Sequence, residues 1–322
     1  MAGDSFSLSP MGTGYTLGRA GRVRPTNRPG QPPPDPGSPI QDTFFTTDHD
    51  VMRNPNYSGN IYSVQSGRWG TASTWSLNRV PISGDSPLIA GGQTVIYDVS
   101  GNAYLTSVGV LSGATLTWDT AVNTRMTVVT LCVQEEGRCI VGNSGSPIQS
   151  GKLAEIQIAD VPLDTTSDPF QYWNGVLALG EIRMYGQAKS STAWRTTVEP
   201  LSGALSLTFS GAPTNWYPGD QLILPDTKQG GGPVGYCYES NYQNFDEVLT
   251  IASGHNSTQI FFQSGLTKLH AGARDISGTI TFLPHVGNLT RNVKVYSESC
   301  SGTRGHVMLT HHAHPHLLNV EF

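Results

Sequence analysis

Val110-Leu-Ser-Gly-Ala-Thr-Leu116 and Val133-Gln-Glu-Glu-Gly-Arg-Cys-Ile140 are the segments that decide the fold class of this 322-residue chain. Each segment places an apolar strand, a glycine turn and the start of another apolar strand, and Gly113 and Gly137 lie twenty-four residues apart. That separation is about one coil of a parallel β-helix, in which each coil buries its apolar face only by stacking on the next. Glycine turns are also used by hairpins in β-sandwiches, so that alternative stays open here.

Short β-rich runs separated by Gly, Pro, Asn and Asp continue on both sides of these segments, from Ile61 onward. None of the runs shows a sustained helical period, which indicates an all-β architecture. Ser83-Gly-Asp-Ser-Pro-Leu-Ile89 and Pro218-Gly-Asp-Gln-Leu-Ile223 both predict a Gly-Asp turn that starts a strand. In such turns we expect Asp85 and Asp220 to cap backbone amides.

The composition excludes several classes of function. Only 13% of residues are charged and the net charge is −5, so no long-range field attracts a phosphate backbone, and we predict no nucleic-acid partner. No apolar run approaches the ~20 residues of a bilayer span, and residues 1–40 lack the pattern of a secretory signal. Export therefore requires a segment outside this sequence or another route.

Residues 1–58 are rich in Gly, Pro, Ser and Thr, with Pro-Gly-Gln-Pro-Pro-Pro-Asp-Pro-Gly at 29–37. Too little apolar surface is present to offset the entropy of ordering, which predicts a flexible Gly/Pro-rich arm. Its four arginines can anchor the arm to a partner and so support self-assembly through residues 1–58. A solvated linker explains the same composition.

Four cysteines allow three disulfide pairings. Cys132 and Cys139 are separated as in a hairpin, and Cys237 and Cys300 can join distant turns. Free buried thiols are the alternative.

An ordered set of motifs resembles a known family. The motifs are Gly67-Arg-Trp-Gly70, Thr74-Trp75, Val80-Pro-Ile-Ser-Gly-Asp85, Ala90-Gly-Gly-Gln-Thr-Val-Ile-Tyr-Asp98, the two glycine turns, Trp216-Tyr-Pro-Gly-Asp-Gln-Leu-Ile-Leu-Pro-Asp-Thr227, Leu269-His-Ala-Gly-Ala-Arg-Asp275, Leu289-Thr-Arg-Asn-Val-Lys-Val-Tyr-Ser-Glu298 and Gly302-Thr-Arg-Gly-His306. Together they resemble the eight-glycine domain of extracellular proteins such as fibrocystin and the hyaluronidases related to cell-migration-inducing protein.

The resemblance implies an eight-glycine β-rich module over residues 59–190 that continues into the first coils of a right-handed parallel β-helix (a β-solenoid) over 191–322. It also implies an extracellular or cell-surface location and polysaccharide, including hyaluronan, as the substrate class. The chain departs from the family in two ways. In relatives the β-helix continues well beyond the Arg-Gly-His strand, and here a histidine-rich segment follows Thr310.

The Gly302–His306 motif holds two candidate catalytic residues. Arg304 can fork onto the carboxylate of an acidic sugar, which also makes it a candidate for binding substrate, and His306 can act as acid or base. An arginine that satisfies turn carbonyls explains the same residues. Arg291 is a similar substrate-binding candidate, beside an Asn292 that can stack in a coil turn.

The histidines after Thr310 are the candidate metal ligands. His312, His314 and His316 would share one face of a strand at steps of about 6.6 Å, and neutral imidazoles chelate Zn²⁺ or a similar divalent ion. Pro315 weakens the strand interpretation because it cannot donate to a ladder. An exposed polar strand end is the alternative.

Glycan cleavage usually requires two carboxyl groups held close together. Asp246, Glu247, Glu239 and Asp275 are available, and Asp275 is the third candidate catalytic residue; the sequence gives no distances between them.

Tryptophan rings can stack on the apolar faces of sugars, although most aromatic residues in such a fold are core residues. Trp173 and Trp194 lie next to polar loops and are the better surface candidates.

Two functions stay open. The first is an extracellular polysaccharide-interacting protein, and one form of it is the N-terminal part of a hyaluronidase-like glycan-degrading enzyme. The alternative is a non-catalytic structural component of a surface, filament or virion. The sequence leans away from enzymatic activity for this chain as given; an active form would cleave polysaccharide.

Overall fold

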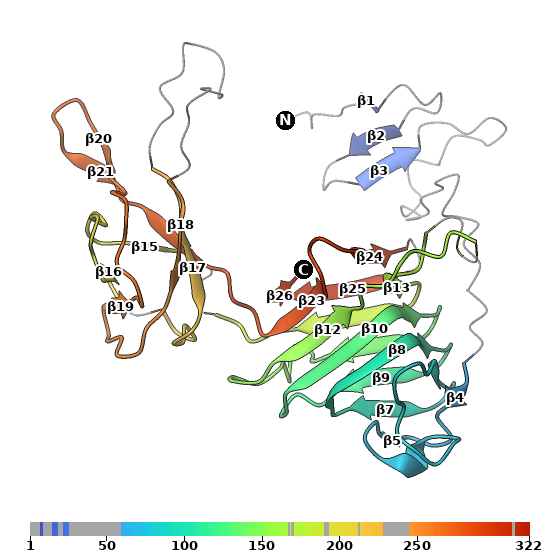
Figure 1. Ribbon diagram of the computed structural model, residues 1–322. Coiled ribbons are helices and arrows are strands. Elements are labelled where there is room, and N and C mark those ends of the chain that lie inside the picture. Colours follow the sequence, from blue (N-terminus) through green and yellow to red (C-terminus); the bar gives the residue numbers. More distant parts are fainter. Residues whose placement is uncertain are drawn as a thin grey trace.

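The computed structural model shows an all-β protein (Figure 1). It describes residues 59–322 except 167, 169–170, 190–192, 212, 228–244 and 311–312. For residues 193–194 it describes the backbone alone. In the N-terminal region it describes the backbone of three short antiparallel strands. The rest of the predicted arm over 1–58 lies outside the described residues. Those three strands are β1 (Ser7–Leu8), β2 (Tyr15–Gly18) and β3 (Arg22–Pro25), and the helical element of the described residues is one 3₁₀ turn, η1 (Ala72–Thr74).

Two sheets of parallel strands form the larger body, and successive strands from β4 to β12 alternate between them. The first sheet has the order β26-β23-β12-β10-β8-β6-β4, with β13 on β10 and β24 on β13; the second has the order β25-β14-β11-β9-β7-β5. The first contains β4 (Ile61–Tyr62), β6 (Pro87–Ile89), β8 (Ser100–Val110), β10 (Thr124–Val133), β12 (Ala154–Ile158), β13 (Gly175–Ala178), β23 (Val293–Ser297), β24 (His306–Leu309) and β26 (Val320–Glu321). The second contains β5 (Gly67–Arg68), β7 (Thr94–Tyr97), β9 (Thr115–Trp118), β11 (Arg138–Val141), β14 (Glu181–Tyr185) and β25 (His314–Leu318).

The segments Val110–Leu116 and Val133–Ile140 lie one on the other. Val110 pairs with Val133 and Leu116 with Cys139, both in parallel register, so the hairpin alternative is wrong for these segments. Gly113 has a φ of 73° and donates its amide to Glu136. A side chain at Gly137 would lie 2.8 Å from the carbonyl oxygen of Val110. Glycine is therefore required at both turns, at the first for its dihedral angle and at the second for close stacking.

The core lies between the two sheets, where strand alternation points every second side chain inward. Four aromatic rings form a continuous column at one end: the Trp69–Trp75, Trp69–Tyr97 and Tyr97–Trp118 centroids are 4.7, 5.0 and 5.2 Å apart. All four residues are buried, and Trp75 donates its indole N–H to the carbonyl of Trp69 at 2.8 Å. These tryptophans are core residues and contribute no sugar-stacking surface.

Antiparallel strands make a second body between β14 and β23, which stands apart from the parallel sheets in Figure 1. It has its own buried apolar cluster, which includes Phe209, Trp216 and Leu222. We call this body the lobe. Its strands are β15 (Ala193–Arg195), β16 (Ser206–Thr208), β17 (Gln221–Leu224), β18 (Glu247–Thr250), β19 (Gln259–Phe261), β20 (Ala273–Arg274), β21 (Ile280–Phe282) and β22 (His285–Asn288).

Residues 191–322, treated as one unit in the sequence analysis, thus contain both the lobe and strands that rejoin the parallel sheets. After the lobe, β23 pairs with β12, with Ala154 opposite Val293.

Cys132 and Cys139 are both buried and no disulfide joins them, so the hairpin-type pairing of these two is not formed in the structure. Burial raises the pKa of Cys139 to about 12. Cys300 is free and exposed, and Cys237 lies outside the described residues.

The two Gly-Asp turns have the same construction. Gly84 and Gly219 have φ angles of 87° and 91°, and each following aspartate accepts a hydrogen bond from a turn amide. Asp85 also accepts from the side chains of Asn60 and Arg79, at 3.0 Å and 2.5 Å. The prediction that these aspartates cap backbone amides is confirmed, and each also binds an asparagine and a cation.

We expect Asp85→Asn to lower the free energy of unfolding by about 2 kcal/mol near neutral pH. Hydrogen bonds led by that from Arg79 lower the pKa of buried Asp85 from 3.8 to about 2. The stabilisation is complete above the unfolded-state pKa and is lost as pH falls through the folded-state pKa. Urea unfolding at a series of pH values measures this, and indistinguishable pH profiles for wild type and variant would contradict it.

Candidate functional site

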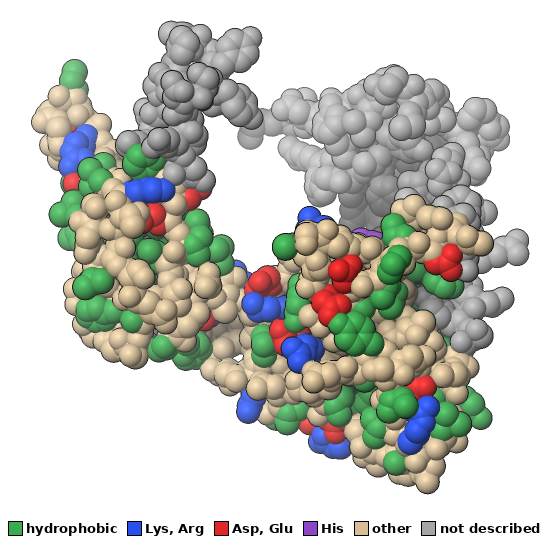
Figure 2. Space-filling view, viewed as in Figure 1, with side chains coloured by type: hydrophobic (Ala, Val, Ile, Leu, Met, Phe, Trp, Pro, Cys, Tyr) green, Lys and Arg blue, Asp and Glu red, His purple; other side chains and the backbone are tan. Residues whose placement is uncertain are grey.

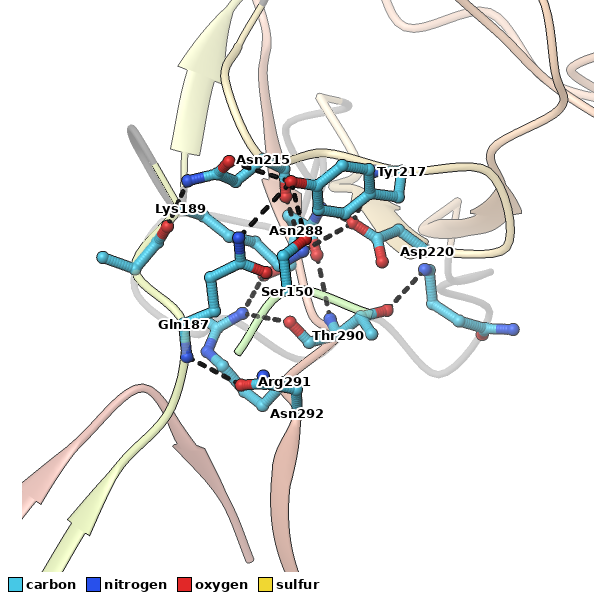
Figure 3. A network of polar contacts seen from close by, with 12 residues as sticks. Ser150, Gln187, Lys189, Asn215, Tyr217, Asp220, Asn288, Thr290, Arg291 and Asn292 are labelled. Atoms are coloured by element: carbon cyan, nitrogen blue, oxygen red, sulfur yellow. Dashed lines mark hydrogen bonds and ion pairs between the residues drawn. The ribbon is translucent and has the colours of Figure 1, made fainter. Parts of the chain in front are cut away.

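A cavity of about 500 Å³ lies where the lobe joins the parallel sheets. The two chain segments that connect these bodies, after β14 and before β23, both line it (Figure 3). The residues around it are Ser150, Gly151, Lys152, Leu153, Gln187, Lys189, Tyr217, Asp220, Thr290, Arg291, Asn292 and Lys294.

Asn292 fixes the wall on the side of the parallel sheets. Its amide nitrogen donates to the carbonyl oxygens of Ile148, Gln149 and Lys152 at 3.1, 3.2 and 3.2 Å. Its amide oxygen accepts from the backbone N–H of Gln187 at 2.7 Å. One side chain therefore ties both connecting segments to the turn before β12.

Asp220 fixes the wall on the side of the lobe. Lys189 contacts its carboxylate at 2.6 Å, and both side chains are less than a tenth exposed. Asn288 donates to the same carboxylate oxygen at 2.8 Å, and the backbone N–H of Tyr217 does so at 3.1 Å. Because Lys189 precedes the lobe and Asn288 ends its last strand, one buried carboxylate holds both connections.

Tyr217 spans the cavity from the lobe. Its hydroxyl accepts from Ser150 at 3.0 Å and from Gln187 at 3.3 Å, and donates to Asn215 at 3.0 Å. The Lys189 ammonium lies 5.7 Å from the centre of its ring. The hydroxyl is held by three side chains, and the residue remains 38% exposed.

Basic residues dominate the charge of the cavity. Lys189 is neutralised by Asp220, and Lys294 lies 3.0 Å from Glu321 at the rim. Among the described residues, no carboxylate pairs with Lys152 or Arg291. These two positive charges are available to an anion.

Arg291 is held in position by backbone contacts. Its Nη1 donates to the carbonyl oxygens of Asn288 and Thr290, at 2.9 and 2.8 Å. The hydroxyl of Thr290 accepts from the backbone N–H of Gln221 at 2.7 Å, which anchors this turn to the lobe. Both of these bonds of the guanidinium use one nitrogen, so its Nη2 and Nε edge is left for a ligand.

Three other predicted residues come together at a different place, at the start of β13 and β24. Gly175 pairs with His306, the Nε2 atom of His306 lies 3.2 Å from the carbonyl oxygen of Tyr172, and the neighbouring Trp173 is 41% exposed. Arg304 is exposed and, in the described part of the chain, makes no bond to turn carbonyls. The cavity lies at the N-terminal ends of β12 and β23, whereas this group lies beyond their C-terminal ends.

The glycines of the same motif are required for packing. A side chain at Gly302 would collide with the carboxylate of Asp160, and one at Gly305 would collide with Ile158. The Asp160 carboxylate also accepts the backbone N–H of Thr303 at 2.7 Å.

The carboxyl candidates belong to the structure of the lobe. Asp275 shapes the exposed turn between β20 and β21, where the hydroxyl of Ser277 and backbone amides hold its pKa below its usual range. Burial acts to raise the pKa of Glu247, but hydrogen bonds led by those from Thr267 lower it overall. Its carboxylate also lies 2.9 Å from Nε2 of the buried His270. Asp246 is exposed, and Glu239 lies outside the described residues.

The remaining predicted residues are only partly described. His314 and His316 lie on β25 and are exposed, and His312 lies outside the described residues. Within the described chain, no three His, Cys, Asp or Glu residues are grouped to hold a metal. The metal site stays a prediction. Trp194 lies on β15 opposite Val286, but its side chain is not described.

Sequence reasoning found Arg291 and missed its companions Lys152, Lys189 and Tyr217. A hint was present for Tyr217, which precedes the second Gly-Asp turn. Lys152 and Lys189 carry no motif, because their position depends on pairing between distant segments.

Two comparisons with known proteins bear on the family of this chain. Residues 74–197 match the family model of the G8 domain, the eight-glycine domain that the sequence motifs predict. Dog (Canis lupus familiaris) fibrocystin is 22% identical over 235 residues, which are 73% of this chain and 5% of fibrocystin. Both findings support the G8 family for this all-β protein, and the chain spans only a small part of the length of this relative.

No helix in the described ranges has the length and apolar character needed to cross a bilayer.

We expect Asp220→Asn to destabilise the protein by about 3 kcal/mol, because it leaves the Lys189 ammonium buried without a countercharge. The double variant Lys189→Met/Asp220→Asn should be more stable than Asp220→Asn alone. Chemical denaturation of the wild type, both single variants and the double variant measures the coupling. Strictly additive losses would show that the two groups do not act as a pair.

Proposed function

We propose that this chain is part of an extracellular protein and binds an acidic polysaccharide, with one carboxylate-bearing sugar in the cavity between the lobe and the parallel sheets. The observation that carries the proposal is the charge of Arg291 and Lys152, which no described carboxylate neutralises, beside a cavity of about 500 Å³. Cavities of this size accommodate small ligands.

Arg291 supports a carboxylate in particular. A guanidinium binds a carboxylate through two parallel N–H donors, and Arg291 has its Nη2 and Nε edge available while Nη1 is fixed to two carbonyls. The side chain is thus ordered before a ligand arrives, which lowers the entropic cost of binding.

Tyr217 supports a sugar over a simple anion. Its partly exposed ring lines the cavity beside hydroxyl and amide groups of Ser150 and Gln187. An aromatic surface bordered by hydrogen-bonding groups suits a pyranose, which has apolar ring faces and polar edges.

The parallel pairing of every second strand, such as β8 with β10 and β9 with β11, also supports the finer fold proposal, a parallel β-helix that begins in the eight-glycine module. We propose that the lobe is an insertion and that the strands from β23 onward resume the coils of residues 59–190. The G8 match and the similarity to fibrocystin support an extracellular location, and neither supports a virion.

Binding without cleavage is the activity proposed for this site. Arg304 and His306 lie at the far ends of β12 and β23 from the cavity, and Asp275 lies in the lobe hairpin. The described structure therefore supports no joint catalytic role for these three candidates.

We expect Arg291→Ala and Lys152→Ala each to weaken binding of a hyaluronan tetrasaccharide about tenfold at low salt, because each removes a charged contact to the carboxylate. Isothermal titration calorimetry measures the affinities. Added salt should reduce wild-type affinity, and a neutral dextran oligosaccharide should bind weakly or not at all.

Arg138→Ala is the matched control, since this exposed arginine lies on β11 of the second sheet. If it weakens binding as much as Arg291→Ala, the interaction is a general charge effect and the proposed site is wrong. Absence of binding to a panel of uronate-containing polysaccharides would overturn the function itself.

The structural role remains the second candidate, and one observation favours it. β24, β25 and β26 end the pairing orders of the described strands, so each has an edge to which another strand can add. Concentration-dependent particle mass in light scattering is the expected result for such a component, and a constant monomer mass would count against it.

A further inference from the structure

Two rows of outward side chains cross the first parallel sheet next to the cavity. One row contains Arg125, Glu155, Lys294 and Glu321, which are neighbours in the parallel register. The other contains Tyr104, Thr127, Gln157 and Tyr296. We call the second row the tyrosine row, because a tyrosine stands at each end of it.

Strand alternation points these side chains away from the core. On β23, Val293 and Val295 are buried in the core, while Lys294 and Tyr296 between and after them are only partly buried. On β8, Leu105 is buried and the preceding Tyr104 is 42% exposed. In Figure 2 this face is turned to the viewer, with acidic and basic side chains alternating across it.

The face continues directly from the cavity. Lys294 lines the cavity and is also the first outward residue of β23. Tyr296 follows two residues later, about 6.6 Å along the strand. Beyond it, the carboxylate of Glu298 bonds to the hydroxyl of Tyr104, which places the second tyrosine farther along the same path.

The charged groups of this face bond to neighbouring polar or charged side chains. Lys294 contacts Glu321 at 3.0 Å, Tyr296 donates to Glu155 at 3.2 Å, and Arg125 donates to Asn102 at 3.0 Å. Of these contacts, the one between Lys294 and Glu321 is an ion pair. Beside its charged groups, the face offers tyrosine rings and amide groups. Such a surface suits the uncharged ring faces of a sugar chain whose carboxylate lies in the cavity.

We infer that the tyrosine row is an extension of the cavity that binds further residues of a linear acidic glycan, so that the site prefers long chains to short ones. The inference rests on the proposed function, because it takes the cavity as the point where the glycan carboxylate binds. It assigns Tyr296 to the sugars next to the cavity and Tyr104 to the more distant ones.

Calorimetry with hyaluronan oligosaccharides of increasing length tests this. We expect a decasaccharide to bind the wild type about tenfold more tightly than a tetrasaccharide. Tyr104→Ala should remove most of that gain and leave tetrasaccharide affinity within about twofold, whereas Tyr296→Ala, next to the cavity, should weaken both oligosaccharides and the decasaccharide more. Tyr296→Phe keeps the ring and loses the hydroxyl, which bonds to Glu155, so it should keep the gain.

Tyr62→Ala is the matched control, because Tyr62 is a 54% exposed tyrosine on β4, in the same sheet but far along its strand order. It should bind both oligosaccharides as the wild type does. Equal wild-type affinity for the two lengths, or equal losses for both lengths in Tyr104→Ala, overturns the inference. If tetrasaccharide binding still depends on Arg291 in that case, the proposed function stands without it. If no oligosaccharide binds, both are wrong.

Discussion

The parallel pairing of β12 with β23 is the constraint on which the rest of the structure depends. The chain leaves the parallel sheets after β14, builds the whole lobe, and returns to place Val293 opposite Ala154. This return brings the two connecting segments side by side, and Asn292 and Asp220 then bond across them. The cavity exists because the two segments must run close together at this one place.

The same constraint decides which polar groups are available for binding. Buried polar groups need hydrogen-bond partners, and the partners of Asn292, Asp220 and Lys189 all belong to the structure that holds the two segments. Two backbone carbonyl groups hold Arg291 through one nitrogen only. No carboxylate of the described residues pairs with Lys152. The charged groups proposed to bind the ligand are therefore those that the structural bonds do not fully use, which explains why basic character and rigidity occur together there.

The sequence predicted features that depend on local or repeated patterns. Gly113 and Gly137 marked stacked turns, and Asp85 and Asp220 marked capped turns, because glycine dihedrals and short polar side chains act within a few residues. The antiparallel lobe was not foreseen, since period-two alternation is the same for parallel and antiparallel strands. Arg291 was named, but Lys152 and Tyr217 meet it only through contacts between distant segments.

The lobe also has a consequence for the order of folding. To pair β23 with β12, the chain must close a loop that contains all residues between β14 and β23. If the lobe forms first, its own core brings the two connecting segments together, and the open loop shrinks from about a hundred residues to about ten. The entropic cost of closure then falls by about 2 kcal/mol. Early formation of the lobe thus lowers the entropic cost of completing the parallel sheets.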